Sequence, residues 1–131
     1  MGYRSEVNFM FYPEEDEHFQ VMKLWLDENM PGTTPKSQSD YALLECSTYD
    51  EDSRPYIFYT ACDVKWYEGY TEVDAVMQAI EDFNNLFCGE DATTPCSYEY
   101  VRIGEETEDI EYRFSDNAEF RMHVRREVMV D

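Results

Sequence analysis

Six apolar side chains between residues 73 and 87 recur at the spacing of an α-helix: Val73, Val76, Met77, Ile80, Phe83 and Phe87. A stripe of this kind covers one face of a helix, and that face has to be buried against another element. Thr71 is of a type that caps helix N-termini and has Asp74 three residues later, while Gly89 is typical of a helix end. We therefore predict an amphipathic helix that Thr71 caps and Gly89 terminates.

The segment before this helix carries a strand pattern and then a helix pattern. Apolar and polar residues alternate over residues 6–12, which predicts a half-buried strand. Pro13 and the acidic residues 14–17 suit the first turn of a helix, so a first helix is expected to start there, and residues 31–32 (Pro-Gly) close it. Its apolar residues recur at helical spacing: Phe19, Met22, Trp25 and Leu26.

The remaining segments favour strands joined by polar turns. In chain order we expect a loop over 33–40, a strand over 41–47, an acidic turn over 49–54, a strand over 55–66, a strand over 98–103, an acidic turn over 105–111, and one or two C-terminal strands around 110–114 and 120–124. The strands over 41–47 and 55–66 should pair as a hairpin.

This order of elements is β-α-β-β-α-β followed by C-terminal hairpin strands. It predicts an α+β protein of the ferredoxin-like, split βαβ type, with an antiparallel sheet and two helices on one face. A chain of 131 residues fits one domain, and we expect residues 1–131 to form a single one. Eight Phe, eleven Tyr and two Trp can build its core, so the high charge does not indicate a disordered chain.

Thirty Asp and Glu against ten Lys and Arg give a net charge of −20. Such a surface repels the phosphates of nucleic acids and of anionic lipids, so the expected partner is a protein or complex with a basic surface. No apolar run approaches the roughly 18 residues of a membrane span, and residues 1–4 lead into the first strand rather than into a signal peptide. We expect a cytoplasmic location, no membrane contact and no direct nucleic-acid binding.

The four cysteines, Cys46, Cys62, Cys88 and Cys96, stand 16, 26 and 8 residues apart. This spacing contains no Cys-x-x-Cys pair of the kind that begins a zinc site. Reduced thiols are the simplest interpretation for an intracellular chain. A bridge or a shared metal contact between Cys88 and Cys96 is the alternative.

The sequence contains no Walker loop, zinc-protease motif, nucleophile elbow or dinucleotide fingerprint. His18 and His123 are interpreted as surface residues, and residues 105–111 lack the spacing and the glycine of a calcium-binding EF-hand loop. We therefore expect no catalytic residue, no cofactor and no metal site. A small metal-dependent enzyme that uses clustered carboxylates stays open as the alternative, because thirty acids bring some carboxylates together by chance.

Acidic clusters and one aromatic segment are the candidate partner-binding residues. They are Glu14, Glu15, Asp16, Glu17, Asp50, Glu51, Asp52, Trp66, Tyr67, Tyr70, Glu105, Glu106, Glu108 and Asp109. The aromatic side chains are either packed at a strand end or exposed as interface anchors, and packing is favoured. Arg121, Arg125 and Arg126, with His123, form a basic strip that should pair with acids of a neighbouring strand.

Residues 2–7 (GYRSEV), 63–70 (DVKWYEGY) and 100–105 (YVRIGE) resemble a family of small proteins encoded by tailed bacteriophages. The resemblance covers most of the chain apart from residues 27–54. The family has no assigned activity. The resemblance implies a phage accessory protein that acts in the bacterial cytoplasm, where small acidic phage proteins such as anti-CRISPR inhibitors disable host defence or host enzymes.

These observations predict an inhibitor that occupies the nucleic-acid-binding surface of a host defence or nucleic-acid-processing complex, as a DNA mimic does. The expected surface of roughly 7,000 Å² carries about one net charge per 350 Å², whereas duplex DNA carries about one per 100 Å². Mimicry therefore requires acids to be concentrated on one face, with an apolar centre for lasting affinity. The alternatives are charge for solubility alone, and a self-assembling phage accessory protein, for which a homodimer is one form.

Overall fold

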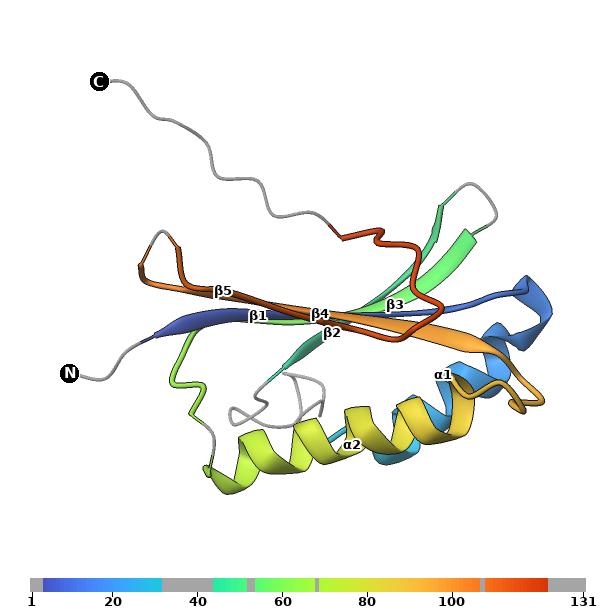
Figure 1. Cartoon of the computed structure of the whole chain (residues 1–131), viewed down its shortest axis with the longest axis horizontal. Helices are drawn as coiled ribbons and strands as arrows, with labels where there is room; N and C mark the ends of the chain where they lie inside the picture. The colour runs from blue at the N-terminus through green and yellow to red at the C-terminus, as the bar shows by residue number, and fades with distance from the viewer. Residues whose placement is uncertain (1–3, 32–43, 52–53, 68, 107, 123–131) are drawn as a thin grey trace.

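The computed structural model describes residues 4–31, 44–51, 54–67, 69–106 and 108–122 (Figure 1). These residues form an α+β structure in which one antiparallel sheet carries two α-helices on one face, as the sequence predicts. The strands are β1 (Ser5–Pro13), β2 (Glu45–Glu51), β3 (Arg54–Val64), β4 (Cys96–Gly104) and β5 (Ile110–Phe114). The helices are the 3-10 turn η1 (Asp16–His18), α1 (Phe19–Asn29) and α2 (Thr71–Phe87).

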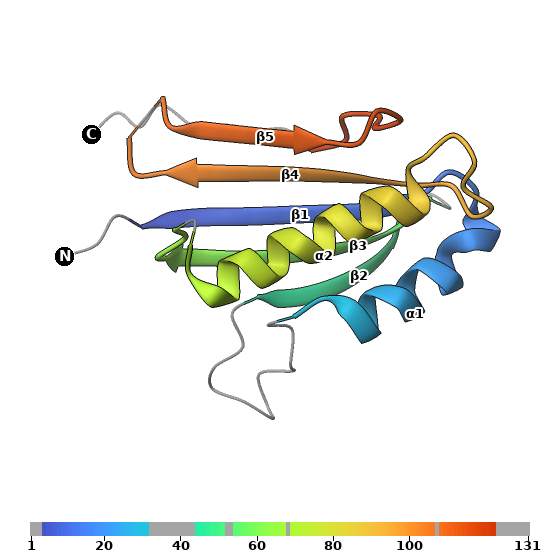
Figure 2. The same cartoon turned by 60° about the horizontal axis from the view of Figure 1, so that its bottom comes forward.

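The strand order in the sheet is β2-β3-β1-β4-β5, and all neighbouring strands are antiparallel. Helix α1 connects β1 to β2, and α2 connects β3 to β4, so each helix joins two strands that have one other strand between them. Figure 2 shows the consequence: both helices cross the same face of the sheet, while β5 extends the sheet beyond α2. The opposite face, which we call the open face, carries no helix of the described chain.

Strand β1 lies at the centre of the sheet, and its C-terminal half, Phe9 to Tyr12, is buried on both faces. Val7, Phe9 and Phe11 point into the core under the helices. Met10 and Tyr12 point to the open face and are buried as well. The predicted alternation is therefore present in β1. The open face of the strand is also covered in part, by residues that follow β5.

The apolar stripe of α2 fills the space between the helices and the sheet. All its members are buried except Met77, which is half-buried. Phe83 is the centre of this core, because its ring packs 4.8 Å from Phe11, 5.8 Å from Trp25 and 6.4 Å from Tyr98, centroid to centroid. Met22 and Leu26 close the core from α1. Helical spacing in the sequence thus identifies the residues that join the two layers.

Two predicted helix starts are wrong by a few residues. Pro13 is the last residue of β1 and pairs with Cys96, so the first helix begins at η1 and not at the proline. A proline fits the end of a strand because it has no N–H, and no hydrogen bond to the neighbouring strand is required at that position. In α2 the N-cap is Tyr70 and not Thr71, and the Asp74 carboxylate accepts the N–H of Gly69 at 3.0 Å. Gly69 has φ +97°, a conformation that suits glycine.

The predicted hairpin forms with a shifted turn. Strand β2 runs to Glu51, where the sequence predicts an acidic turn from residue 49, because residues 45–51 all pair with β3. Of the predicted C-terminal strands, β5 forms at 110–114. Residues 120–122 are not a strand, and the amides of Arg121 and Met122 donate to the Glu99 side chain instead of to a neighbouring strand. The predicted loop over 33–40 and residues 123–124 lie outside the described chain.

Replacing Phe83 by alanine should destabilise the fold by about 3 to 5 kcal/mol, because it leaves a cavity between α2 and the sheet. The matched control is Leu86→Ala in the same helix, whose side chain is 52% exposed and should cost less than about 1 kcal/mol. Urea denaturation followed by circular dichroism measures both. Similar losses for the two variants would contradict this account of the core.

Candidate functional site

The exposed carboxylates of the described chain gather around the two helices. We call residues 14–29 and 71–91 the helix layer. Its exposed acids are Glu14, Glu15, Asp16, Glu17, Asp27, Glu28, Glu72, Asp74, Glu81, Asp82, Glu90 and Asp91. Lys23 is the one lysine or arginine in these two segments, and it forms an ion pair of 3.0 Å with Asp27. The helix layer is therefore strongly negative.

An apolar hollow lies within this acidic layer, between α1 and the C-terminal half of α2. Its volume is about 300 Å³, and it is lined by Val21, Leu24, Trp25, Glu28, Leu86, Phe87, Thr93 and Thr94. Leu24 is 62% exposed, and Val21 and Leu86 are also more than half exposed. Large apolar side chains that are rimmed by charge mark interaction surfaces, because their contact with water is unfavourable. Sequence reasoning missed this hollow, since Val21 and Leu24 lie outside the buried stripe of α1.

The predicted acidic clusters lie at two opposite ends of the sheet. Residues 14–17 follow the C-terminal end of β1, whereas Glu105, Glu106, Glu108 and Asp109 lie beside its N-terminal end, because Ser5 pairs with Gly104. A nine-residue strand separates these ends by roughly 25 to 30 Å. The end of β2 and the start of β3 lie at the same end as residues 14–17, since Phe11 pairs with Ile57 and Glu51 pairs with Arg54. The side chains of Asp50 and Glu51 and the whole of Asp52 lie outside the described part.

Glu15, Glu17 and His18 bring three potential metal-ligand atoms within 4.8 Å of one another. They are the single such group among the described residues. All three come from one turn, and both carboxylates are exposed, while His18 Nε2 lies 3.7 Å from Glu17. This is an open, hydrated cluster that could bind a divalent cation only weakly, because nothing holds the carboxylates in a fixed geometry.

At the other end of the sheet, part of the predicted cluster is engaged within the chain. Glu105 accepts the N–H of Arg4 at 2.8 Å. Asp109 accepts two hydrogen bonds from the guanidinium of Arg102, at 2.8 and 3.2 Å. Glu106 and Glu108 are exposed. Asp109 therefore holds the β4–β5 turn.

The aromatic segment after β3 divides into packed and exposed members. Trp66 packs against Phe9, 6.0 Å between ring centroids, and is half-buried. Tyr67 is also half-buried and contacts Tyr70 edge to face at 5.3 Å. Tyr70 is 46% exposed. Of the three predicted anchors, Tyr70 is thus the one with a large exposed surface.

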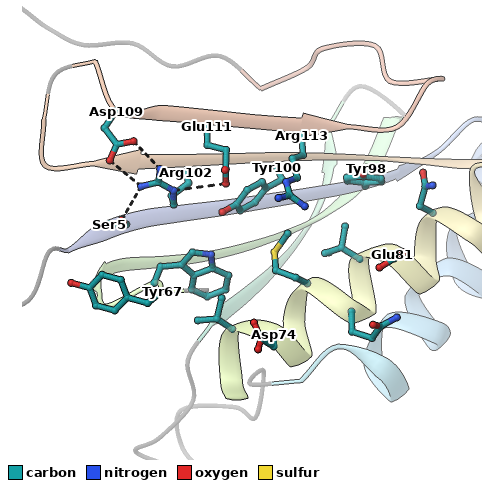
Figure 3. A pocket seen from close by; sticks show the side chains of 16 residues that line it. Ser5, Tyr67, Asp74, Glu81, Tyr98, Tyr100, Arg102, Asp109, Glu111 and Arg113 are labelled. Atoms are coloured by element: carbon teal, nitrogen blue, oxygen red, sulfur yellow. Dashed lines mark hydrogen bonds and ion pairs between the residues drawn. The ribbon is translucent and has the colours of Figure 1, made fainter. Parts of the chain in front are cut away.

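A groove of about 800 Å³ separates α2 from the β4–β5 end of the sheet (Figure 3). Trp66, Tyr67, Tyr98 and Tyr100 form its aromatic floor and end. Arg102 lies in it and binds Asp109, with Glu111 at 3.8 Å and the Ser5 hydroxyl at 3.3 Å. The hydrogen bonds to Asp109 raise the pKa of Arg102, and burial followed by the nearby Glu111 raises the pKa of Tyr100.

The carboxylates of this groove stand on opposing walls. Asp74 and Glu81 come from α2, whereas Asp109 and Glu111 come from the strand side and are directed to Arg102 (Figure 3). Acid–base or two-metal chemistry needs carboxylates that converge on one point. Within the described chain, the group at residues 15–18 is the one that brings metal ligands together, and it does not line the groove.

The open face holds a buried carboxylate that sequence reasoning did not identify. Glu99 is 4% exposed and accepts hydrogen bonds from the Tyr12 hydroxyl at 2.5 Å and from the amides of Arg121 and Met122 at 2.8 and 2.9 Å. The Tyr12 oxygen in turn accepts the N–H of Glu119 at 2.7 Å. Burial, and then the bond to Glu99, raise the pKa of Tyr12. We call these contacts the Glu99 clamp, because they fasten residues 119–122 to the sheet.

The predicted pairing of the basic strip with acids is wrong for Arg121. Its guanidinium lies 4.9 Å from the ring of Tyr12 and 5.0 Å from that of Tyr56, and it donates to the carbonyl of Arg54 at 3.4 Å. Aromatic faces attract a guanidinium by cation–π interaction. The acid of this region, Glu119, pairs with Arg54 instead. His123, Arg125 and Arg126 lie outside the described residues.

All four cysteines are free thiols. Cys46 and Cys62 are exposed, whereas Cys88 is half-buried and Cys96 is buried. The Cys88 thiol donates a hydrogen bond to the carbonyl of Cys96 at 3.1 Å. Burial raises the pKa of both to about 12, so neither carries the thiolate that nucleophilic or metal chemistry requires.

Thiol labelling should divide the cysteines accordingly. At pH 9, the ordinary pKa of a thiol, Cys88 and Cys96 stay protonated and unreactive in the folded protein, while the exposed Cys62 is modified. Cys46 is exposed too, but burial raises its pKa, so it should react more slowly than Cys62. Mass spectrometry after iodoacetamide treatment identifies the sites. All four should react in denaturant, and modification of Cys96 in the folded protein would refute this assignment.

Replacing Glu99 by glutamine should release residues 119–122 from the open face. An amide group cannot accept both backbone N–H bonds and the Tyr12 hydroxyl as a carboxylate does, so we expect a loss of about 1 to 3 kcal/mol in stability. Hydrogen exchange at the amides of Arg121 and Met122 should become faster. Glu108→Gln, an exposed change of the same kind, is the control and should leave these amides protected.

Comparison with known proteins adds no further assignment. No protein-family model matches the chain, and no curated protein or solved structure matches it either. Neither described helix has both the length and the apolarity that crossing a bilayer requires. The function has to be argued from the surfaces described above.

Proposed function

We propose that this chain is a non-catalytic binding protein whose acidic helix layer occupies the basic, nucleic-acid-binding surface of a host defence or nucleic-acid-processing complex and so inhibits it. The observation that carries the proposal is the concentration of exposed carboxylates on the helix layer, where the single lysine is already paired. A surface of this kind attracts basic grooves and accelerates association.

Charge density supports the helix layer over the molecule as a whole. The net charge of −20 over an accessible surface of 8794 Å² is about one charge per 440 Å², which is far more dilute than the roughly one per 100 Å² of duplex DNA. The 11 residues of α1 and the 17 residues of α2 are about 16 and 25 Å long, so two helices about 10 Å wide present a projected area of roughly 400 Å². Their exposed acids are Asp27, Glu28, Glu72, Asp74, Glu81 and Asp82, and Lys23 offsets one of them. That gives about one net charge per 80 Å² of projected area, which is comparable to the density of DNA.

The apolar hollow supplies what charge alone does not. Attraction between exposed charges is screened by salt and contributes mainly to the rate of association. Leu24, Val21 and Leu86 expose an apolar patch between α1 and the C-terminal half of α2, where a partner's side chain would exclude water. Slow dissociation then depends on this apolar patch, and the choice of partner depends on the surrounding acids.

We also propose a bacteriophage origin and a ferredoxin-like fold for this chain. The three sequence stretches that resemble phage proteins support a phage accessory role in the bacterial cytoplasm, which includes inhibition of CRISPR systems. The strand order, in which each helix joins strands separated by one other, supports a ferredoxin-like split βαβ fold with β5 added at the β4 edge. The solvent-facing acids at residues 14–17, which belong to the helix layer, and Tyr70 are further candidate contacts.

A small carboxylate-dependent enzyme is the competing function. The groove beside α2 has the size of a ligand pocket, and this observation favours an enzyme or a small-molecule binder. Its acids stand on opposing walls, however, and those on the strand side are directed to Arg102. Binding by the helix layer is therefore the better-supported function.

The proposal predicts which charges matter for partner capture. Immobilised wild-type protein should retain nucleic-acid-handling proteins from bacterial lysate at low salt, and added duplex DNA should elute them better than polyglutamate of equal charge. Reversing Glu72 and Glu81 to lysine should slow association about tenfold at low salt, because both side chains lie exposed on α2. Surface plasmon resonance with the captured partner measures this rate.

The matched control reverses Glu105 and Glu108 to lysine, which changes the net charge equally at the end of the sheet. An equal loss in both variants would mean that the partner responds to total charge and not to the helix layer. Failure to retain any nucleic-acid-handling protein, or elution by polyglutamate as readily as by DNA, would contradict the proposal.

A further inference from the structure

Strand β5 is the outermost strand of the sheet, and its outer edge is unpaired within the described chain. An edge of this kind presents N–H and C=O groups that can pair with another strand. Its side chains alternate. Glu111 and Arg113 lie on the helix side and line the groove, whereas Tyr112 and Phe114 lie on the open face and are 52% and 48% exposed.

The sequence of β5, Ile-Glu-Tyr-Arg-Phe, has apolar and charged residues at the same positions in both directions, and reversal exchanges the two charges. An apolar residue stands at each end, a charged residue of opposite sign follows inward from each end, and Tyr112 is the centre. A strand with this symmetry is complementary to an antiparallel copy of itself. Strand β5 lies outside the helix layer, so this surface is independent of the function proposed above.

We propose that a second copy of this chain binds along the β5 edge in antiparallel register about Tyr112, which joins the two sheets into one. Glu111 then faces Arg113 of the second copy, and Arg113 faces Glu111 of the second copy. Side chains directly opposite in an antiparallel pair have Cβ atoms about 4.5 to 5.5 Å apart, within ion-pair reach. Ile110 faces Phe114 of the second copy at each end of the pairing.

The charges available on β5 fit this arrangement. Arg113 is exposed, and no carboxylate of the described residues forms an ion pair with it. Glu111 lies 3.8 Å from Arg102 and accepts a hydrogen bond from Tyr100, and its side chain remains 43% exposed, so a second cation can still reach its carboxylate. A second copy of the chain would bring a carboxylate to Arg113, and the two side chains could then form an ion pair.

The same charges select the register. Sliding the second copy by two residues in one direction places Glu111 opposite Glu111, and sliding it in the other places Arg113 opposite Arg113. Like charges directly opposite each other destabilise a strand pair. The residue-112 register is therefore the one in which every charge on β5 meets its opposite, and a slip by one residue exchanges the faces of the strand.

An apolar cluster beside the edge extends the contact on the open face. Phe120 packs on Phe114, 4.7 Å between ring centroids, and both remain about half exposed. Phe120 has φ +58°, a conformation that is costly for a bulky residue, and the Glu99 clamp on residues 121–122 holds the chain next to it. Tyr112, Phe114, Phe120 and Met122 line a hollow of about 410 Å³ that the second copy would cover in part.

Net charge gives this dimer an unusual dependence on salt. Two molecules of charge −20 repel each other, and salt screens that repulsion beyond a Debye length of about 10 Å at 0.1 M. The short Glu111–Arg113 contacts and the backbone pairing are less screened than the long-range repulsion. Dimerisation should therefore strengthen as salt rises, whereas attraction of a basic partner to the helix layer weakens.

Analytical ultracentrifugation of the full chain over a concentration and salt series tests the proposal. Wild-type protein should form a dimer whose dissociation constant falls as salt rises. Glu111→Arg and Arg113→Glu should each raise that constant at least tenfold, because each places like charges opposite one another. Mixing the two single variants should restore a heterodimer, and the double variant Glu111→Arg/Arg113→Glu should restore a homodimer.

Glu108→Arg is the control for net charge, since it makes the same charge change as Glu111→Arg outside β5 and should leave dimerisation intact. Circular dichroism checks that every variant is folded. A wild-type protein that stays monomeric at high concentration and high salt would overturn the proposal. A dimer that persists in both single variants, or one that the charge exchange does not restore, would do so too.

Discussion

Burial of both faces of β1 in its C-terminal half is the constraint on which the rest of the structure depends. The strand pairs with β3 and β4 on its two edges, so none of its backbone is free to meet water within the sheet. Its helix-side residues need a roof of apolar side chains, which α1 and α2 supply. Its other face carries Met10 and Tyr12, and the chain after β5 folds back to cover them. If the open face were exposed to solvent, the segment after β5 would not have to cover it.

The two coverings use different physics. The helix side is closed by non-directional burial of aromatic and aliphatic groups around Phe83, which tolerates many arrangements of similar volume. The open face is closed by the Glu99 clamp, in which a buried carboxylate has its lone pairs satisfied by one hydroxyl and two amides. A buried charge is tolerated only when its partners are in place, so this covering is specific in geometry.

The sequence predicts the helices, strands and core positions that periodic apolar residues determine, and little else. The stripe of α2 and the alternation in β1 identify the core, because burial imposes a period on them. Glu99 cannot be found in this way, since an acid in a strand looks like a solvent-facing residue until residues 119–122 are placed over it. Local signals at Pro13 and Thr71 mislead because strand pairing and the Asp74–Gly69 hydrogen bond outweigh intrinsic capping preference.

The candidate site illustrates the same limit. From the sequence, acids are predicted to be the functional residues, but the prediction groups them by their proximity in the chain. Folding instead separates residues 14–17 from Glu105 and Glu108 by the length of β1 and gathers scattered acids of α1 and α2 into one layer. Leu24 and Leu86 become neighbours of one hollow for the same reason, because the helices pack side by side.

The two proposed surfaces lie on different parts of the molecule and can therefore act together. Pairing at β5 about an axis through the sheet keeps both helix layers on the same side of the joined sheet, because Glu111 and Arg113 of both copies share that side. Two acidic layers would then face one partner or two adjacent sites, and the second contact would become intramolecular. Salt weakens binding of a basic partner to the helix layer and strengthens pairing of two copies at β5. The population of the complete assembly therefore depends on the balance between repulsion of the copies and attraction of the target.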